Sequence, residues 1–296
     1  MTSIEAKDGS AKVAVCTGFA LAAFAANSVI CRLALDEATI DAGSYSTIRL
    51  VSGAVTLLLI TAVFKKKRLS GSWGNWPSAI MLFLYAAAFS FAYIKLSTGV
   101  GALILFGMVQ MTMILAALRS GERPHLPEWI GLFLALMGLV YLVFPGLTAP
   151  SPTGAALMGI AGISWGVYSL WGRGAVDPLA ETTKNFILSL PFVLVVSVIT
   201  IRNIHVSAAG ILLSALSGSL ASGVGYVIWY VALRELTATR AAIVQLSVPV
   251  LAALGGVVFL SEEISIRLLL SSIMILGGIG LAVIGREHLF RLRAKQ

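Results

Sequence analysis

The sequence is poor in charged residues, because aspartate, glutamate, lysine and arginine together make up 11% of its 296 residues. A typical soluble domain carries about 25% charged residues, so this composition disfavours a soluble globular protein. Hydrophobic residues make up 58% of the chain, and the mean hydropathy is +0.94. The leading class is therefore a protein that crosses a membrane many times.

Cysteine and histidine are also scarce, with two and three copies respectively. Cys16 and Cys31 are expected on one helix, about 22 Å apart at 1.5 Å per residue, so they cannot form a disulfide with each other. Every aspartate, glutamate and histidine lies outside or at the edge of an apolar segment. We therefore expect no metal site, no cofactor and no carboxylate in mid-membrane, where proton relays and organic-cation sites normally need one.

Long apolar runs are what the sequence has in abundance. Runs of about 20 residues are long enough to cross a bilayer. Ten occur, at residues 13–34, 44–64, 77–96, 99–118, 126–144, 154–172, 183–201, 208–232, 239–260 and 267–285. The alternation typical of a membrane β-barrel is absent, so the spans should be helices. The predicted fold class is an all-α polytopic membrane protein with ten transmembrane helices.

Loop charges predict the orientation of these helices. If the N-terminus is cytoplasmic, sixteen lysines and arginines face the cytoplasm, including the cluster at 65–68. Only Arg202 and Arg267 then fall in loops on the other side. Lysine and arginine concentrate on the cytoplasmic side of membrane proteins, so both termini are predicted to be cytoplasmic, in the cytoplasmic (inner) membrane. The net charge of +8 does not indicate a nucleic-acid partner, because no nucleic-acid-reading motif surrounds the basic clusters.

The chain repeats itself with an offset of about 140 residues. At an offset of 141, "FAANSVICR" at 24–32 aligns with "WGVYSLWGR" at 165–173. At an offset of 140, the segment 117–122 aligns with 257–262, and Gly138 aligns with Gly278. The repeating unit holds five spans, and an odd number inserts the second copy upside down. Such inverted repeats are typical of secondary transporters, whose substrate site lies near mid-membrane between the halves.

The repeat divides the chain into five parts. We expect a cytoplasmic tail at 1–12, a first five-helix repeat at 13–145, an extracytoplasmic linker at 146–153, a second five-helix repeat at 154–285 and a basic cytoplasmic tail at 286–296. No connection is long enough for a separate soluble domain. The two repeats should surround a central cavity and act as a monomer.

An acidic residue comes just after the fourth span in each half, Glu122 in "LRSGER" and Glu262 in "FLSEEI". With the two five-helix halves and their first spans rich in small and aromatic residues, this chain resembles the EamA-type drug/metabolite transporters (DMT superfamily), and among them the YddG-like amino-acid exporters. The resemblance covers nearly the whole chain. It implies export of small metabolites by alternating access.

Members of that family often carry Trp-Gly in the first span and proline in the fourth span of each half. This chain keeps Trp165-Gly166 and Pro249 in its second half, but has Phe24-Ala25 and Val109 in its first.

Polar and aromatic side chains within the spans are the candidates for lining the cavity. Each has a structural alternative, such as a bond between helices or an aromatic anchor at the membrane surface. The candidates are Asn27, Ser28, Tyr85, Tyr93, Gln110, Trp165, Tyr168, Ser169, Tyr226, Trp229 and Gln245.

Three cations are expected around one outer vestibule. Arg32, Arg49 and Lys95 would there attract a carboxylate, or would instead pair with the acidic first loop at Asp36 and Glu37. Pro249 is a candidate hinge, because proline removes the backbone hydrogen bond to residue 245 and tends to kink a helix.

These features predict a secondary transporter of small zwitterionic or amphipathic metabolites, above all amino acids, including aromatic ones. That the direction is export is implied by the family resemblance alone. The alternative is an exporter of another solute class: a cationic drug, a nucleotide-sugar or an organic phosphate. An intramembrane enzyme is a remote alternative, because it would need a nucleophile–base pair, a carboxylate dyad or a metal cluster in the membrane. The expected partners are a small-molecule substrate and the lipid bilayer.

Overall fold

The protein is a bundle of helices. The computed structural model describes residues 3–36, 39–64, 75–119, 126–144, 149–236, 244–245 and 247–293. Its helices are α1 (Ser3–Asp36), α2 (Ala42–Phe64), α3 (Trp76–Tyr93), α4 (Thr98–Arg119), α5 (Leu126–Val143), α6 (Pro152–Gly172), α7 (Pro178–Ile199), η1 (Ile201–Asn203), α8 (Ala208–Leu216), η2 (Ser217–Val224), α9 (Gly225–Glu235), α11 (Ser247–Leu260) and α12 (Ile266–Arg293). One isolated β-bridge, between Ile40 and Val206, joins two loops.

The helices confirm the predicted all-α membrane fold. Seven are long and apolar enough to cross a membrane, and one of these is the continuous helix Ala208–Glu235 formed by α8, η2 and α9. Three shorter apolar helices, Trp129–Leu142, Ser247–Leu260 and Ile266–Gly278, occupy the positions of the fifth, ninth and tenth predicted spans.

Two helix starts differ from the sequence prediction. Helix α7 begins at Pro178 instead of 183, because the Asp177 side chain accepts a hydrogen bond from the Ala180 N–H and caps a first turn that contains polar residues. Helix α1 begins at Ser3, so the segment expected to be a tail at 1–12 is helical from residue 3.

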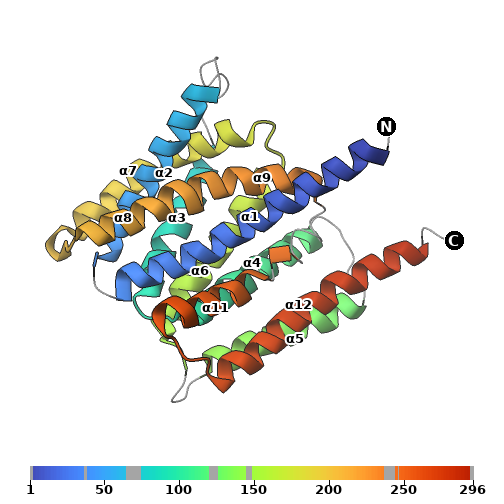
Figure 1. Ribbon diagram of the computed structural model, residues 1–296. Helices are drawn as coiled ribbons and strands as arrows, with labels where there is room; N and C mark the ends of the chain where they lie inside the picture. Colours follow the sequence, from blue (N-terminus) through green and yellow to red (C-terminus); the bar gives the residue numbers. More distant parts are fainter. Residues whose placement is uncertain are drawn as a thin grey trace.

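The start of α1 and the end of α12 lie at the same end of the bundle (Figure 1). We call it the terminal end, and the opposite end, which carries the α3–α4 turn and the loop from α11 to α12, the distal end. Helices α5 and α12 lie side by side at one edge of the bundle. They are the fifth helix of each half, and the sequence places them in equivalent positions.

Helices α5 and α12 pack through equivalent glycines. A Cβ on Gly138 would lie 2.7 Å from Met274 Cβ, and a Cβ on Gly278 would lie 2.5 Å from the Gly131 carbonyl oxygen. Because higher residue numbers on α5 meet lower ones on α12, the two helices are antiparallel. Aligned glycines that lie in one antiparallel contact are what two inverted halves require.

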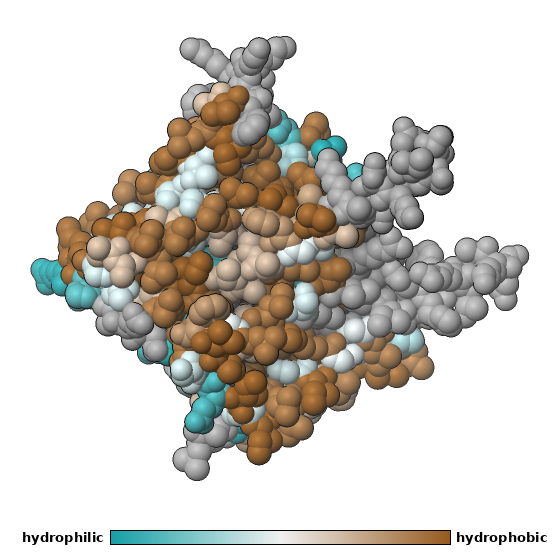
Figure 2. All heavy atoms as spheres, in the orientation of Figure 1, coloured by the Kyte–Doolittle hydropathy of each residue, from teal (hydrophilic) through white to brown (hydrophobic). Residues whose placement is uncertain are grey.

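The flanks of the bundle are apolar. Large hydrophobic side chains are exposed along α5 and α7, among them Leu126, Phe133, Val198 and Ile199. Figure 2 shows hydrophobic residues over most of the visible face, with hydrophilic ones gathered towards its margins. An exposed surface of this composition fits a lipid environment.

Candidate functional site

Five aromatic side chains meet in the centre of the bundle. This central aromatic cluster consists of Phe24 from α1, Tyr85 from α3, Trp165 from α6, and Tyr226 and Trp229 from α9. The Trp165 ring centroid lies 4.6 Å from that of Tyr226, 5.0 Å from that of Tyr85 and 5.5 Å from that of Phe24. Trp229 packs edge-on against Phe24 at 5.6 Å. Aromatic pairs at these separations attract one another.

The two halves contribute equivalent residues to this cluster. Phe24 and Trp165 are separated by 165 − 24 = 141 positions, and Tyr85 and Tyr226 by 226 − 85 = 141 positions. This is the offset at which the first spans of the two repeats align. Each residue also contacts its counterpart, since the Tyr85 and Tyr226 ring centroids lie 6.4 Å apart. The cluster therefore lies where the pseudo-twofold axis between the halves passes.

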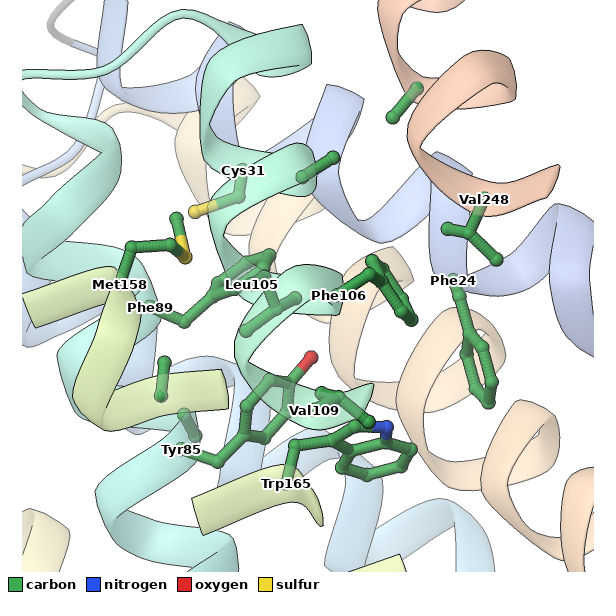
Figure 3. Close-up of a cluster of buried hydrophobic side chains, with 14 of the residues drawn as sticks. Phe24, Cys31, Tyr85, Phe89, Leu105, Phe106, Val109, Met158, Trp165 and Val248 are labelled. Carbon is green, nitrogen blue, oxygen red and sulfur yellow. The ribbon is translucent and has the colours of Figure 1, made fainter. Parts of the chain in front are cut away.

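Figure 3 shows how the rings approach one another. The Trp165 indole lies between Tyr85 and Phe24, with Val109 and Phe106 of α4 beside it. All these side chains are buried, and Trp165 is 2% exposed. The rings fill the centre against one another in this structure, so a substrate would have to separate them in order to bind.

Arg49 lies in the same centre, which corrects its predicted place at the outer surface. Helix α2 begins at Ala42, so Arg49 is seven residues into the helix, or about 10 Å from its start. The side chain is 1% exposed and ranks among the largest fully buried side chains of the protein. The sequence prediction placed it at the surface because a charge near the end of an apolar run is assigned to the nearer membrane surface, although Arg49 is already five residues inside the predicted span 44–64.

A close crossing of α2 and η2 brings Arg49 inward. A Cβ on Gly218 would lie 2.0 Å from the Arg49 carbonyl oxygen, so only glycine allows this approach. Gly218 belongs to η2, an eight-residue π-helix in the middle of the continuous helix. Single π turns inside α-helices occur frequently at functional sites. In this protein the π segment carries Ser222 and leads directly into Tyr226.

Hydroxyl groups and aromatic rings surround the Arg49 guanidinium. Its Nε donates to Ser222 Oγ at 3.0 Å, and its Nη2 donates to the hydroxyls of Tyr85 at 3.1 Å and Tyr226 at 2.9 Å. The guanidinium carbon lies 5.1 Å from the Tyr85 ring centroid and 4.9 Å from that of Phe89. Its Nη1 has no hydrogen-bond partner among the described residues.

Asn27 extends this polar network to α1. Its Nδ2 donates to the Tyr85 hydroxyl at 3.3 Å, and its Oδ1 accepts from Ser217 Oγ of η2 at 2.5 Å. A chain of hydrogen bonds therefore connects α1, α2, α3, η2 and α9 in the interior. Ser28 is buried beside Asn27 on α1.

A second aromatic pair, on α6 and α9, lies closer to the terminal end of the bundle. The Tyr168 and Tyr230 ring centroids lie 5.7 Å apart, and the Tyr230 hydroxyl donates to the Tyr168 carbonyl at 3.3 Å. The Tyr168 hydroxyl accepts from Asn185 Nδ2 of α7 at 3.5 Å. Tyr168 also contacts Trp165 at 5.7 Å, so the aromatic surface continues from the centre towards this end. Ser169 is buried next to it.

The two glutamines and the candidate hinge are also buried. Gln110 lies on α4, and Gln245 lies in the short helical segment 244–245 before α11. Both amide atoms of Gln245 lack a hydrogen-bond partner among the described residues. Pro249 is the third residue of α11, which begins at Ser247. Residue 246, before this helix, is outside the described residues. Bending at Pro249 stays a prediction.

Arg32 belongs to a contact between the halves at the distal end. Its Nε lies 3.6 Å from Glu262 Oε1, and its Nη1 donates to the Tyr93 carbonyl at 3.1 Å. The Glu262 carboxylate accepts the Thr98 backbone N–H at 2.8 and 2.9 Å and the Thr98 hydroxyl at 3.0 Å. We call these four residues the distal latch, because Thr98 starts α4 of the first half while Glu262 follows α11 of the second.

The expected outer vestibule of three cations is not found. Lys95 is exposed and donates to Thr153 Oγ1 at 3.1 Å, while Arg49 lies buried in the centre. Arg32 contacts Glu262, whereas its expected partners, the Asp36 side chain and Glu37, lie outside the described residues. Glu122 and the basic cluster at 65–68 also lie outside them.

Several residues of the site were not predicted from the sequence. Ser222 belongs to a stripe of small residues in the eighth span, which most simply predicts close helix contact. Phe89 and Ser217 gave no local signal, because apolar and small residues are ordinary in a membrane helix. Phe24 did give one, since it aligns with Trp165 in the repeat.

Comparisons with known proteins agree with the two-half architecture. The model of the EamA-like transporter family matches the chain twice, at residues 12–144 and 152–284. The chain is similar to an uncharacterized protein, PA1977, of Pseudomonas aeruginosa, with 46% identity over 91% of this chain and 94% of that protein. It is also similar to the uncharacterized transporter YoaV of Bacillus subtilis, with 24% identity over 79% of this chain and 85% of YoaV. A protein crystal structure with 19% identity superposes with a TM-score of 0.63 over 92% of this chain and 98% of the other, which shows a shared fold.

Proposed function

Since this chain belongs to the EamA-like transporter family, we propose that it exports small zwitterionic or amphipathic metabolites, above all amino acids, including aromatic ones. It does so across the cytoplasmic membrane by alternating access, as a monomer with both termini in the cytoplasm. The two halves rock against each other around the central aromatic cluster, and α11 bends near Pro249.

The observation that carries this proposal is the central aromatic cluster. Symmetry-related rings from both halves meet in the interior, at the place where inverted-repeat transporters bind their substrates. Aromatic faces favour apolar and aromatic groups, while the adjoining hydroxyls and the Asn27 amide offer hydrogen bonds to a polar group. A solute with an apolar side chain and a small polar head fits this combination.

The charge in the centre argues against a cationic solute. Among the described residues, Arg49 is the charged group there, and a positive charge repels a cationic drug. Every acidic residue of the chain lies outside or at the edge of the predicted spans.

Counterflow in liposomes tests the proposal. Purified protein is reconstituted, loaded with one unlabelled solute and assayed for uptake of the same labelled solute, across a panel of amino acids, organic phosphates and organic cations. We expect saturable counterflow of amino acids, with the aromatic ones among the best. Counterflow of phosphates or cations with none of any amino acid would refute the proposed substrate class.

Two tryptophans on α6 provide a matched pair of variants. Trp165 is 2% exposed in the cluster, whereas Trp171, six positions later, is 48% exposed. We expect Trp165→Ala to lower counterflow at least about tenfold, which corresponds to about 1.4 kcal/mol, and Trp171→Ala to retain it. Equal activity of the two folded variants would remove the cluster from the substrate path.

A further inference from the structure

A buried arginine in a membrane protein needs a physical reason. Arginine stays protonated in proteins, so Arg49 carries its charge inside the bundle. Taking an ion out of water costs several kcal/mol unless other groups compensate the charge. Ionisable residues inside a membrane are therefore rare and usually mark the path of a solute.

The groups around Arg49 solvate its charge but do not neutralise it. Three hydroxyls accept hydrogen bonds from Nε and Nη2, and two aromatic rings face the guanidinium. Among the described residues no carboxylate forms an ion pair with Arg49, and the one ion pair of this region joins Arg32 to Glu262. The Nη1 amino group is buried and has no acceptor there. A purely structural arginine would be expected to use this donor as well.

The Arg49 charge has no counterpart in the second repeat. Tyr85 and Tyr226 are counterparts in the two halves, and both accept a hydrogen bond from the same Nη2. The position 141 residues after Arg49 is Leu190, so the second half supplies no equivalent charge. The two equivalent tyrosines thus bind a single guanidinium, which the first repeat supplies.

We propose that the Arg49 guanidinium binds the carboxylate of the transported solute, with Nη1 as the donor that the carboxylate engages. The inference rests on the proposed function, because it assigns the polar half of the same central site. The carboxylate accepts a charge-assisted hydrogen bond from Nη1, and it gains a second, parallel one from Nη2 by displacing one of the two tyrosine hydroxyls, which gives both strength and orientation. Tyr85 links the polar part of the site to its aromatic part, since its hydroxyl contacts Arg49 and its ring contacts Trp165.

A carboxylate fits this site better than a phosphate ester does. A phosphate monoester carries up to two negative charges near neutral pH and would be better matched by a second cation. Arg32 and Lys95, the other candidate cations, lie in the distal latch and on the surface respectively. One guanidinium matches one carboxylate, and the neutral hydroxyls around it accept or donate without adding charge.

Pairs of ligands that differ only in charge at this group test the inference on the wild-type protein. The probes are phenylalanine with phenylalaninamide, and 3-phenylpropionate with 3-phenylpropionamide. Binding is measured by quenching of tryptophan fluorescence and by the rise in Tm of purified protein in detergent. We expect the carboxylate of each pair to bind at least about tenfold more tightly, in keeping with a charge-assisted hydrogen bond.

Variants locate the preference at Arg49. Arg49→Gln should reduce the carboxylate-to-amide ratio to about one, and Arg49→Lys, which keeps the charge without the planar fork, should retain part of it. Lys95→Gln, at an exposed cation, should leave the ratio unchanged. If Arg49→Gln does not fold, the wild-type ratios and Arg49→Lys still decide the question.

The outcomes separate this inference from the proposed function. Equal binding of carboxylate and amide by the wild type would overturn the role of Arg49, even if amino acids are transported. Tighter, Arg49-dependent binding of phenyl phosphate than of 3-phenylpropionate would also overturn it, in favour of a phosphate ligand. Arg49-dependent binding of 3-phenylpropionate without binding or counterflow of any amino acid would support it while refuting the proposed substrate class.

Discussion

Phe24 and Trp165 occupy equivalent positions in the two halves, and their rings meet edge-on with centroids 5.5 Å apart at an interplanar angle of 79°. Because each ring comes from the first helix of its own half, the contact changes whenever the halves move relative to each other. A solute that enters the centre would separate this pair and replace one ring as the neighbour of the other.

Phe24 should therefore matter for transport as much as Trp165 does. We expect Phe24→Ala to lower amino-acid counterflow about tenfold, because the site loses one of the two equivalent rings, Phe24 and Trp165, that meet at its centre. Phe19, five positions earlier on α1 and exposed, is the matched control, and Phe19→Ala should transport normally. Normal flux through Phe24→Ala would contradict a central site.

Neighbouring glycines on α12 should differ sharply in tolerance. A Cβ on Gly278 would lie 2.5 Å from the Gly131 carbonyl oxygen, whereas a Cβ on Gly277 meets nothing within 4 Å. We expect Gly278→Ala to destabilise the fold by about 1–3 kcal/mol through overpacking, and Gly277→Ala to leave stability unchanged or slightly higher. Tm measurements on the purified variants compare the two, and an unchanged Tm for Gly278→Ala would argue against the α5–α12 contact.

The distal latch should control access from its end of the bundle. Replacing the Glu262 charge in Glu262→Gln weakens the contacts to Thr98 and Arg32 by about 1 kcal/mol, since hydrogen bonds to charged groups are the stronger ones. Cys31, which precedes Arg32 and is buried, reports opening. In a Cys16→Ala background, we expect maleimide to label Cys31 about fivefold faster in Glu262→Gln.

Glu263 provides the control for that experiment. It is exposed and adjacent to Glu262, so Glu263→Gln changes the charge of the loop without touching the latch. Equal labelling rates in the two variants would show that Glu262 does not hold the distal end closed.

Asp41 should make stability depend on pH. Burial alone would raise the pKa of this carboxyl, but hydrogen bonds from Ser44, His205 and Gly43 hold it below its ordinary value. A lowered folded-state pKa stabilises the fold above the unfolded-state value near 4, and this stabilisation disappears as the pH falls through the folded-state value. We expect Asp41→Asn to lower Tm at pH 7, and the difference from wild type to shrink below about pH 4. A difference that is constant with pH would contradict this account.

The sequence was sufficient to predict the overall architecture, because each span carries its own signal. Ten apolar runs and one repeated offset predicted the helices and their order, and the aromatic and amide residues singled out near mid-span, such as Trp165 and Tyr226, do lie in the interior. Such residues stand out because polar and large aromatic groups in a long apolar run need a partner or a wall.

Contacts between distant segments could not be predicted in this way. Glu262 and Thr98 are 164 positions apart, and no local pattern joins them. Arg49 was misplaced because charge in a hydropathy profile is assigned to the nearest membrane surface, whereas its hydroxyl partners come from α3, η2 and α9. The π-helix had no signature either, since its serines and glycines equally suit an ordinary close helix contact.

The eight-residue π segment also bears on how this protein can change in length. A π turn closes its hydrogen bonds between residues i and i+5, one residue more than an α turn, so closing α turns can absorb a single deletion between Ser217 and Val224. A deletion between Tyr226 and Trp229 has no such spare residue and would turn Trp229 and the rest of α9 by about 100°, away from the interior. Relatives of this protein should thus keep the residue count of α9, whereas the π segment before it is free to lose a residue.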